Sequence, residues 1–295
     1  MNYPLTPEQV ALLRLAQTTW ARREAVKQHN LPFGEESITE TILMDLAMAY
    51  PGRMSILPFN KRQEGENGAD WAWAFASSDG SHVLPMLVQA KLLDIKDFEY
   101  PELGRAVGKR TPPVLQIDQL LKAANRHRWP ALYAFYNHLS DPSRIPSVCR
   151  SLPRNGLGMH ESWGITIALA SHVRAAMNDY TFDTHREHSV PLHCLLCSSA
   201  TGERPSSGSA GLALGRLKKM RDFISTDVTQ LAEPFLPEKP LDRMPELFLE
   251  ADRILELHGQ ERDYRLDRLA EENPDIAGVV TFRDAAWPRP HSAFE

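Results

Sequence analysis

The chain has 295 residues, of which 42% are hydrophobic and 24% are charged, so it is long and apolar enough to bury a sizeable core. Its formal net charge of −5 excludes the strongly basic balance of a protein that coats nucleic acid, although a local basic groove is compatible with it. Three cysteines are too few for a disulfide framework, and no apolar run is long enough to span a membrane. We therefore expect a cytoplasmic protein that has no signal peptide and binds no membrane.

Residues 1–30 predict an N-terminal helix that precedes the rest of the fold. Thr6, Pro7 and Gln9 have the spacing of a helix start, with a capping threonine, a proline in the first turn and a glutamine three residues after the cap. Apolar residues then recur with helical spacing to about residue 28.

A second helix is expected over residues 35–49, because Ile38, Ile42 and Leu46 form one apolar stripe. Glu36 and Glu40 are four residues apart and therefore share one face of this helix. Two interpretations stay open for them. They complement the positive end of the helix dipole, as acids near a helix start commonly do, or one of them contributes a carboxylate to a site.

Residues 67–93 are the stretch around which the chain is organised, and they predict two β-strands joined by a turn. Along the first strand, Asp70 points to the face opposite Trp71, since side chains alternate. Along the second strand, Gln89 and Lys91 share a face. The sequence therefore predicts that an acid, an amide and an ammonium group meet at one end of a hairpin, beside small residues that leave room for a ligand. A partly buried Asp–Lys pair in an ordinary α/β sheet is the alternative.

The segments around this hairpin predict the rest of an α/β core over residues 31–140. The further elements are a strand at 54–60, a helix at 114–125 with Gln116 at its start, and a strand at 131–137. The charged connection 94–110 carries candidate phosphate contacts, with a solvated loop as the alternative. These candidates are Lys96, Arg105, Lys109 and Arg110.

Residues 141–295 predict a mixed, largely helical extension packed on the core. Residues 163–176 are apolar with helical spacing, and residues 190–199 look like a strand. A basic helix over 212–232 carries Lys218 and Lys219 as further candidate phosphate contacts, with a solvated helix face as the alternative.

Two histidine-containing patterns in this extension are weighed as metal sites and set aside. The run 193–197, His-Cys-Leu-Leu-Cys, lacks the second ligand pair that a structural zinc ion usually needs, so buried apolar cysteines are favoured. His185 and His188, with Asp183 nearby, are more typical of a polar loop.

The expected order of elements is helix, strand, strand, strand, helix, strand, with Asp70 opening one strand and Gln89-Ala90-Lys91 on the next. This arrangement resembles the restriction-endonuclease-like core of the PD-(D/E)XK nuclease superfamily over about residues 35–137. Gln89 replaces the usual second acid, and the Gln-x-Lys triplet is similar to that of Mrr-type enzymes. The whole chain also resembles an uncharacterised bacterial family.

The resemblance implies a site for Mg²⁺ or Mn²⁺. The implied ligands are the Asp70 carboxylate, the Gln89 side-chain oxygen, the Ala90 carbonyl, and Glu36 or Glu40 from the first core helix. Lys91 would position or help deprotonate the attacking water, and Gln116 would be a second-tier site residue.

The function implied by the resemblance is that of a metal-dependent endonuclease that hydrolyses phosphodiester bonds. DNA is the expected partner, in bacterial defence such as restriction, or in DNA processing. A homodimer or a defence-system partner protein is also considered. Two alternatives remain: a nuclease fold that only binds nucleic acid because Gln89 weakens the metal site, and a protein-interaction module whose sheet is a scaffold.

Overall fold

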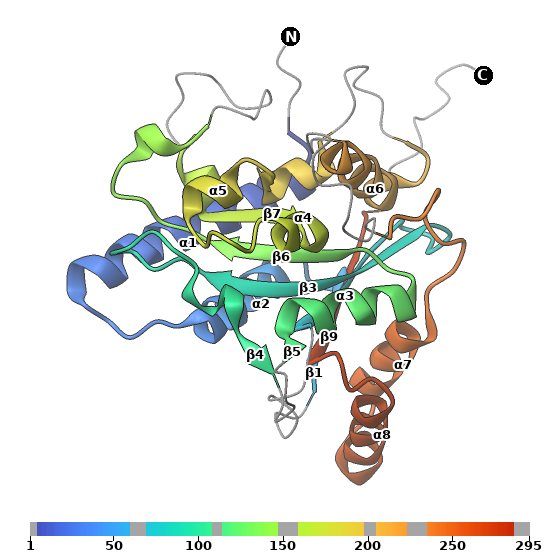
Figure 1. The fold of residues 1–295 in the computed structure, drawn as a ribbon. Helices are drawn as coiled ribbons and strands as arrows, with labels where there is room; N and C mark the ends of the chain where they lie inside the picture. Colours follow the sequence, from blue (N-terminus) through green and yellow to red (C-terminus); the bar gives the residue numbers. More distant parts are fainter. Residues whose placement is uncertain are drawn as a thin grey trace.

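A mixed seven-stranded sheet organises the chain in the computed structural model, which describes residues 5–59, 69–107, 114–146, 159–197, 205–222 and 235–285 (Figure 1). In spatial order the strands are β1 (Met54–Pro58), β9 (Gly278–Arg283), β2 (Trp71–Ala76), β3 (Val83–Leu92), β6 (Ala131–Tyr136), β7 (Ile165–Leu169) and β8 (Ser189–Pro191). Strand β2 pairs in parallel with β9, as β3 does with β6, and the other neighbours are antiparallel. The expected α/β class is confirmed.

Helices cover both faces of the sheet. They are α1 (Pro7–His29), α2 (Glu35–Ala49), α3 (Gln116–His127), α4 (Ala170–Ala175), α5 (Phe182–Arg186), α6 (Gly208–Arg221), α7 (Glu246–Leu255) and α8 (Gly259–Glu272). Shorter elements are the strand pair β4 (Ala106–Val107) and β5 (Val114–Leu115) and the 3₁₀ helices η2 (Pro101–Gly104), η3 (Pro142–Arg144), η4 (Glu161–Gly164) and η5 (Leu192–Leu196). None of the helices in the described ranges is both long and apolar enough to cross a membrane.

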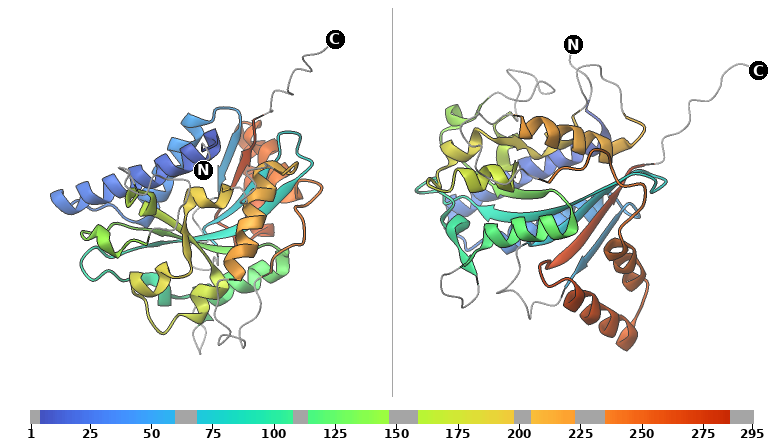
Figure 2. Two further views of the ribbon diagram at one scale, coloured as in Figure 1. Left: turned by 90° about the horizontal axis from the view of Figure 1, so that it is seen from above. Right: turned by 45° about the vertical axis from the view of Figure 1, so that its right-hand side comes forward.

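Two buried cores lie on the two faces. The front core joins the sheet to α3, α7 and α8, and the back core joins it to α2, α6 and the first half of α1. Figure 1 shows α3 crossing in front of the sheet and α2 behind it. The right-hand view of Figure 2 shows α7 and α8 as a helical pair below the sheet.

Helix α1 begins with the capping box that the sequence predicts. The Thr6 hydroxyl accepts a hydrogen bond from the Gln9 N–H at 3.2 Å, and Gln9 Oε1 accepts one from the Thr6 N–H at 2.8 Å. Asn30 ends the helix in the left-handed region, at a φ of 50°. Both ends of the helix therefore follow from local side-chain chemistry.

The central hairpin also forms as predicted, with Trp71 of β2 opposite Val88 of β3. In its turn, Asp79 accepts hydrogen bonds from the Ser77 hydroxyl at 2.6 Å and from the Ser81 N–H at 3.0 Å. The elements α2, β1, β2, β3, α3 and β6 follow one another in the predicted order, with the β4–β5 pair added before α3.

Strand β9 has no counterpart among the expected elements, and it lies between β1 and β2. Val280 pairs with Ile56 of β1 on one side and with Trp73 of β2 on the other. Gly278 permits this packing, because a Cβ at that position would overlap the Trp71 ring. Besides packing on the core, the C-terminal region thus completes its sheet.

Two further segments differ from their expected form. Residues 163–176, which have helical spacing, divide into strand β7 and the short helix α4, and the strand expected at 190–199 ends at Pro191 and continues as η5. Residues 163–173 and 190–196 of these runs are buried throughout, so their apolar content does not distinguish a helix from a strand.

Candidate active site

Asp70 lies directly before β2 and extends the hairpin pairing, since its N–H donates to the Val88 carbonyl at 3.0 Å. Its carboxylate is half-buried and turns back toward β3. Oδ2 accepts two hydrogen bonds, one from Gln89 Nε2 at 2.6 Å and one from the Ala90 N–H at 2.8 Å. The predicted meeting of the acid and the amide is therefore present.

Lys91 lies on the same face of β3 as Gln89 and is only 1% exposed. Its Nζ is 3.8 Å from Oε1 of Glu35, the first residue of α2. The other oxygen of Glu35 accepts a hydrogen bond from the Leu92 N–H at 3.0 Å. Asp70, Gln89, Lys91 and Glu35 together form what we call the β3 site.

A hydrogen bond joins the first turns of α2 to strand β6 of the sheet. The Thr39 and Tyr136 hydroxyls are 2.8 Å apart, and both residues are buried. Since Thr39 is one turn after Glu35, this contact helps to fix the Glu35 carboxylate at the end of β3.

Burial raises the pKa of both carboxyl groups of the β3 site. For Asp70, burial is the largest cause, and Lys91 and the hydrogen bonds from Ala90 and Gln89 lower the pKa in opposition. The pKa of Glu35 is raised to about 7, because burial outweighs the opposing effect of Lys91 and Asp70 adds to the rise. The site thus holds carboxylates whose charged form is disfavoured by the fold itself.

Two more buried polar groups adjoin this face. Tyr133 of β6 is paired in register with Gln89, and the pKa of its buried hydroxyl is raised by burial and then by Asp70, Glu35 and Asp118. Gln116 opens α3, and its N–H donates to the Arg105 carbonyl at 2.9 Å. Among the described residues, no hydrogen-bond partner is present for the Tyr133 hydroxyl or for the side-chain oxygens of Gln89 and Gln116.

The structure brings Glu35, rather than Glu36 or Glu40, to Lys91. The side chains of Glu36 and Glu40 are exposed. Glu35 precedes the buried Ile38 by three residues and therefore shares the stripe that faces the sheet, which is the sequence signal that was missed. Tyr133 was also missed, because its place beside Gln89 depends on the pairing of β3 with β6.

The candidate phosphate contacts are only partly gathered around the site. Arg105 is exposed, and its charge lowers the pKa of Asp70. Lys96 is exposed in the segment after β3, whereas Lys109 and Arg110 lie outside the described residues. Lys218 and Lys219 belong to α6, which packs in the back core, away from the face that carries Gln89 and Lys91. Lys218 Nζ donates to the Glu238 carbonyl at 2.6 Å.

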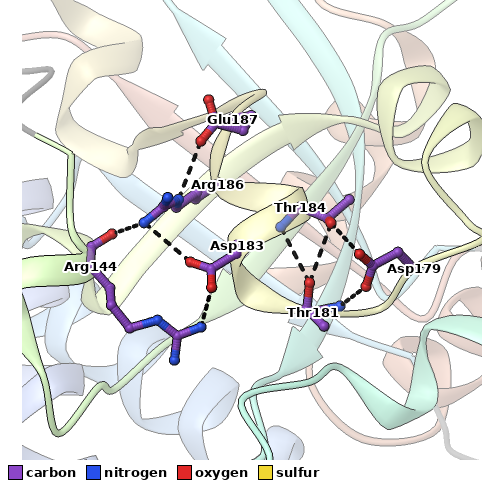
Figure 3. A network of polar contacts seen from close by, with 7 residues as sticks. All are labelled: Arg144, Asp179, Thr181, Asp183, Thr184, Arg186 and Glu187. Carbon is purple, nitrogen blue, oxygen red and sulfur yellow. Dashed lines mark hydrogen bonds and ion pairs between the residues drawn. The ribbon is translucent and has the colours of Figure 1, made fainter.

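A second polar cluster, which we call the α5 network, surrounds helix α5 (Figure 3). It contains Arg144, Asp179, Thr181, Asp183, Thr184, Arg186 and Glu187. Asp183 pairs with Arg144 and with Arg186, and Asp179 accepts a hydrogen bond from the Thr181 N–H at 2.9 Å and another from the Thr184 hydroxyl. Hydrogen bonds from these threonines lower the pKa of Asp179.

The histidine patterns form no metal centre in the described part of the chain. His185 Nε2 lies 2.9 Å from the Asp179 carbonyl, and its Nδ1 lies 3.2 Å from His188 Nε2. Cys194 is buried, 3.6 Å from His193 Nε2. Across the described residues, no three His, Cys, Asp or Glu groups are placed to hold one ion.

The fold and the β3 site define an α/β protein with a buried acid–amide–lysine cluster at the end of a central hairpin. The chain belongs to the family described as "Family of unknown function (DUF6615)", whose model matches residues 8–285. No curated protein and no solved structure matches the chain.

Proposed function

We propose that this chain is a divalent-metal-dependent nuclease that hydrolyses phosphodiester bonds, with DNA as its substrate. The observation that carries the proposal is the β3 site, in which two carboxylates, a buried amide and a buried lysine converge. The order α2, β1, β2, β3, α3, β6 around it supports a restriction-endonuclease-like core, to which β9 would be an addition. A cytoplasmic role in bacterial defence or DNA processing is part of the same proposal.

The oxygen atoms of the β3 site suit Mg²⁺ or Mn²⁺. Asp70, Glu35, the Gln89 side-chain oxygen and the Ala90 carbonyl would hold the ion, and hard cations accept all of these ligand types. The Gln89 oxygen is buried without a partner in the described structure, so it has the capacity to accept a ligand. The site offers only two carboxylates as charged ligands. The Gln89 side-chain oxygen and the Ala90 carbonyl would therefore supply the remaining protein ligands of the ion.

The residues of the site have separable roles in this proposal. Asp70 and Glu35 would hold the cation, whose charge would favour the ionised forms that burial disfavours. A bound cation would lower the pKa of water and polarise the phosphate. Lys91 holds an ammonium group beside the carboxylates, where it orients the attacking water or offsets charge on the scissile phosphate.

A nucleic-acid-binding module without cleavage activity is the second candidate. The observation that favours it is the Gln89 amide, which already donates to Asp70 and adds no negative charge to the site. Both candidates place a phosphate backbone near Arg105, but only the first requires a cation.

Cleavage assays separate the two candidates. Plasmid, single-stranded DNA and RNA are incubated with the protein in Mg²⁺, Mn²⁺ or EDTA. We expect cleavage with either ion, none in EDTA, and none by Glu35→Gln. The matched control is Glu40→Gln, which alters an exposed acid on the same helix and is expected to cleave normally. Cleavage in EDTA would contradict a metal-dependent mechanism, and binding without cleavage would favour the second candidate.

A further inference from the structure

The side chain of Gln89 leaves one of its two polar atoms without a partner, although the residue is only 1% exposed. Nε2 donates to Asp70 Oδ2 at 2.6 Å and also lies 3.3 Å from the Ala90 carbonyl oxygen. Oε1 is buried and has no hydrogen-bond partner among the described atoms. Leaving a buried polar atom without a partner is unfavourable, so the observed orientation depends on the contact with Asp70.

The two ends of a carboxamide are similar in shape and opposite in hydrogen-bonding character. A half-turn of the Gln89 amide would place Oε1 where Nε2 now lies, against the Asp70 carboxylate. Two oxygens at that separation repel each other unless positive charge lies between them. The orientation of the amide is therefore coupled to the presence of a cation at Asp70.

The same half-turn would change two neighbouring groups. The Ala90 carbonyl would lose the N–H that now lies 3.3 Å from it, so its oxygen would become available as a ligand. The turned N–H groups would need a new acceptor, and the register places Tyr133 beside Gln89 with a buried hydroxyl that has no partner in the described structure. One rotation would thus present oxygen atoms from Asp70, Gln89 and Ala90 together.

We propose that the Gln89 amide is a two-position latch: it donates to Asp70 in the ion-free protein and turns its oxygen toward a divalent cation when the ion binds. The latch rests on the proposed function and adds to it the means by which the site stays stable without an ion. A glutamate at this position could hold the ion-free state only in its protonated form, because an ionised carboxylate has no hydrogen to donate to Asp70.

Nuclear magnetic resonance of the full chain labelled with [¹⁵N]glutamine tests the latch directly. The Gln89 side-chain signal is assigned by its loss in Gln89→Met or, if that variant does not fold, by its contacts with the Ala90 N–H. In EDTA we expect one amide proton that is protected from exchange by its bond to Asp70. Saturation with Mg²⁺ should shift this signal and remove the protection.

The outcomes separate the latch from the metal site. An unchanged Gln89 signal at Mg²⁺ concentrations that saturate binding in calorimetry overturns the latch alone. If neither Mg²⁺ nor Mn²⁺ gives binding heat that Asp70→Asn removes, the proposed function fails and the latch fails with it.

Two matched substitutions test the ion-free state. Gln28 Nε2 donates to Glu24 Oε1 at 2.8 Å on the surface of α1, so Gln28→Glu and Gln89→Glu each replace an amide–carboxylate bond by two carboxylates. We expect Gln89→Glu to lower the Tm in EDTA, to regain it with Mg²⁺, and to bind Mg²⁺ about tenfold more tightly. Gln28→Glu should show no ion-dependent shift. An unchanged Tm of Gln89→Glu in EDTA at alkaline pH, where the new carboxyl group is ionised, would contradict the latch.

Discussion

The β3 site and the α5 network both bring carboxylates close to basic side chains, but they shift the pKa values of their carboxyl groups in opposite directions. In the α5 network, hydrogen bonds from threonine lower the pKa of Asp179, so the fold favours its charged form. In the β3 site, burial raises the pKa of Asp70 and brings that of Glu35 to about 7, so the fold opposes the charge. Figure 3 shows Asp179 and Asp183 each contacting two partners.

The two regions therefore differ in how their charges are compensated. A network whose carboxylates gain stability from their own neighbours needs no ligand and holds α5 in place. A site with a disfavoured charge and unpartnered buried oxygens is stabilised further by a ligand that supplies positive charge. Tests of this comparison should therefore separate effects on activity from effects on stability.

The largest expected effect is the contrast between Asp70→Asn and Asp179→Asn. Asp70→Asn should lower cleavage on the order of 10³-fold, because it removes a cation ligand, and should leave the Tm unchanged or higher, because it removes a disfavoured buried charge. Asp179→Asn should lower the Tm and retain cleavage. Nuclease assays and thermal melts of both variants make the measurement, and full cleavage by folded Asp70→Asn would falsify the assigned role.

The second effect concerns the buried lysine. Lys91→Met should abolish cleavage and destabilise the protein at pH 8, since it leaves the Glu35 carboxylate without the ammonium group of Lys91. The loss should be smaller than the about 3–5 kcal/mol of a fully buried pair, because the Glu35 side chain is 26% exposed.

Adding Glu35→Gln to Lys91→Met should restore much of the stability but none of the activity. Urea unfolding at pH 8 measures this recovery. Equal stability of the single and double variants would show that Lys91 does not compensate Glu35.

The third effect is acid destabilisation near the α5 network. Burial lowers the pKa of His172 and His185 from 6.5 to about 4 and that of His188 to about 3. As the pH falls, these histidines take up protons in the unfolded chain near pH 6.5, before they do so in the folded protein. Their contribution to the free energy of unfolding should therefore be fully present above about pH 6.5 and decrease toward pH 4, on the order of 2 kcal/mol per histidine. Urea unfolding from pH 7 to 4 measures the slope, and His172→Phe should reduce it. A stability that does not change between pH 6.5 and 4.5 would contradict burial of these rings in neutral form.

The smallest expected effect compares Arg105, whose charge acts on Asp70 of the β3 site, with Arg186 of the α5 network. Arg105→Ala should reduce the slope of log affinity for DNA against log salt by about one unit, as expected for one lost phosphate contact. Arg186→Ala should not, since Arg186 is already paired with Asp183. Lys218→Ala with Lys219→Ala should also leave the slope unchanged, because α6 packs on the opposite face. A slope that changes only in the α6 variant would move the DNA surface to the back of the sheet.

The sequence predicts well those features that depend on neighbouring residues. The capping box at Thr6, the hairpin around Asp79 and the shared face of Gln89 and Lys91 all follow from local spacing. Glu35 was predictable too, since it precedes Ile38 on the buried stripe, but acids at a helix start suit the dipole equally well.

The features that were missed depend on contacts between distant segments. Tyr133 acquires its place from the pairing of β6 with β3, and β9 from pairing with strands about 200 residues earlier in the chain. Strand β9 is only six residues long, Gly278–Arg283, and follows a charged stretch. Its sequence alone is therefore a weak predictor of a strand inside the sheet. The division of 163–176 into β7 and α4 was missed because a run buried on all sides has no polar face to set its period.

The position of β9 has a consequence for how the molecule is assembled. Until residues 278–283 have been synthesised, β1 and β2 lack the strand that joins them, and both present unpaired backbone edges. The pairing of such distant segments carries a larger loop-closure cost than the local hairpin of β2 and β3. Strand β2, which begins directly after Asp70, therefore acquires its second neighbour only when this C-terminal strand is in place.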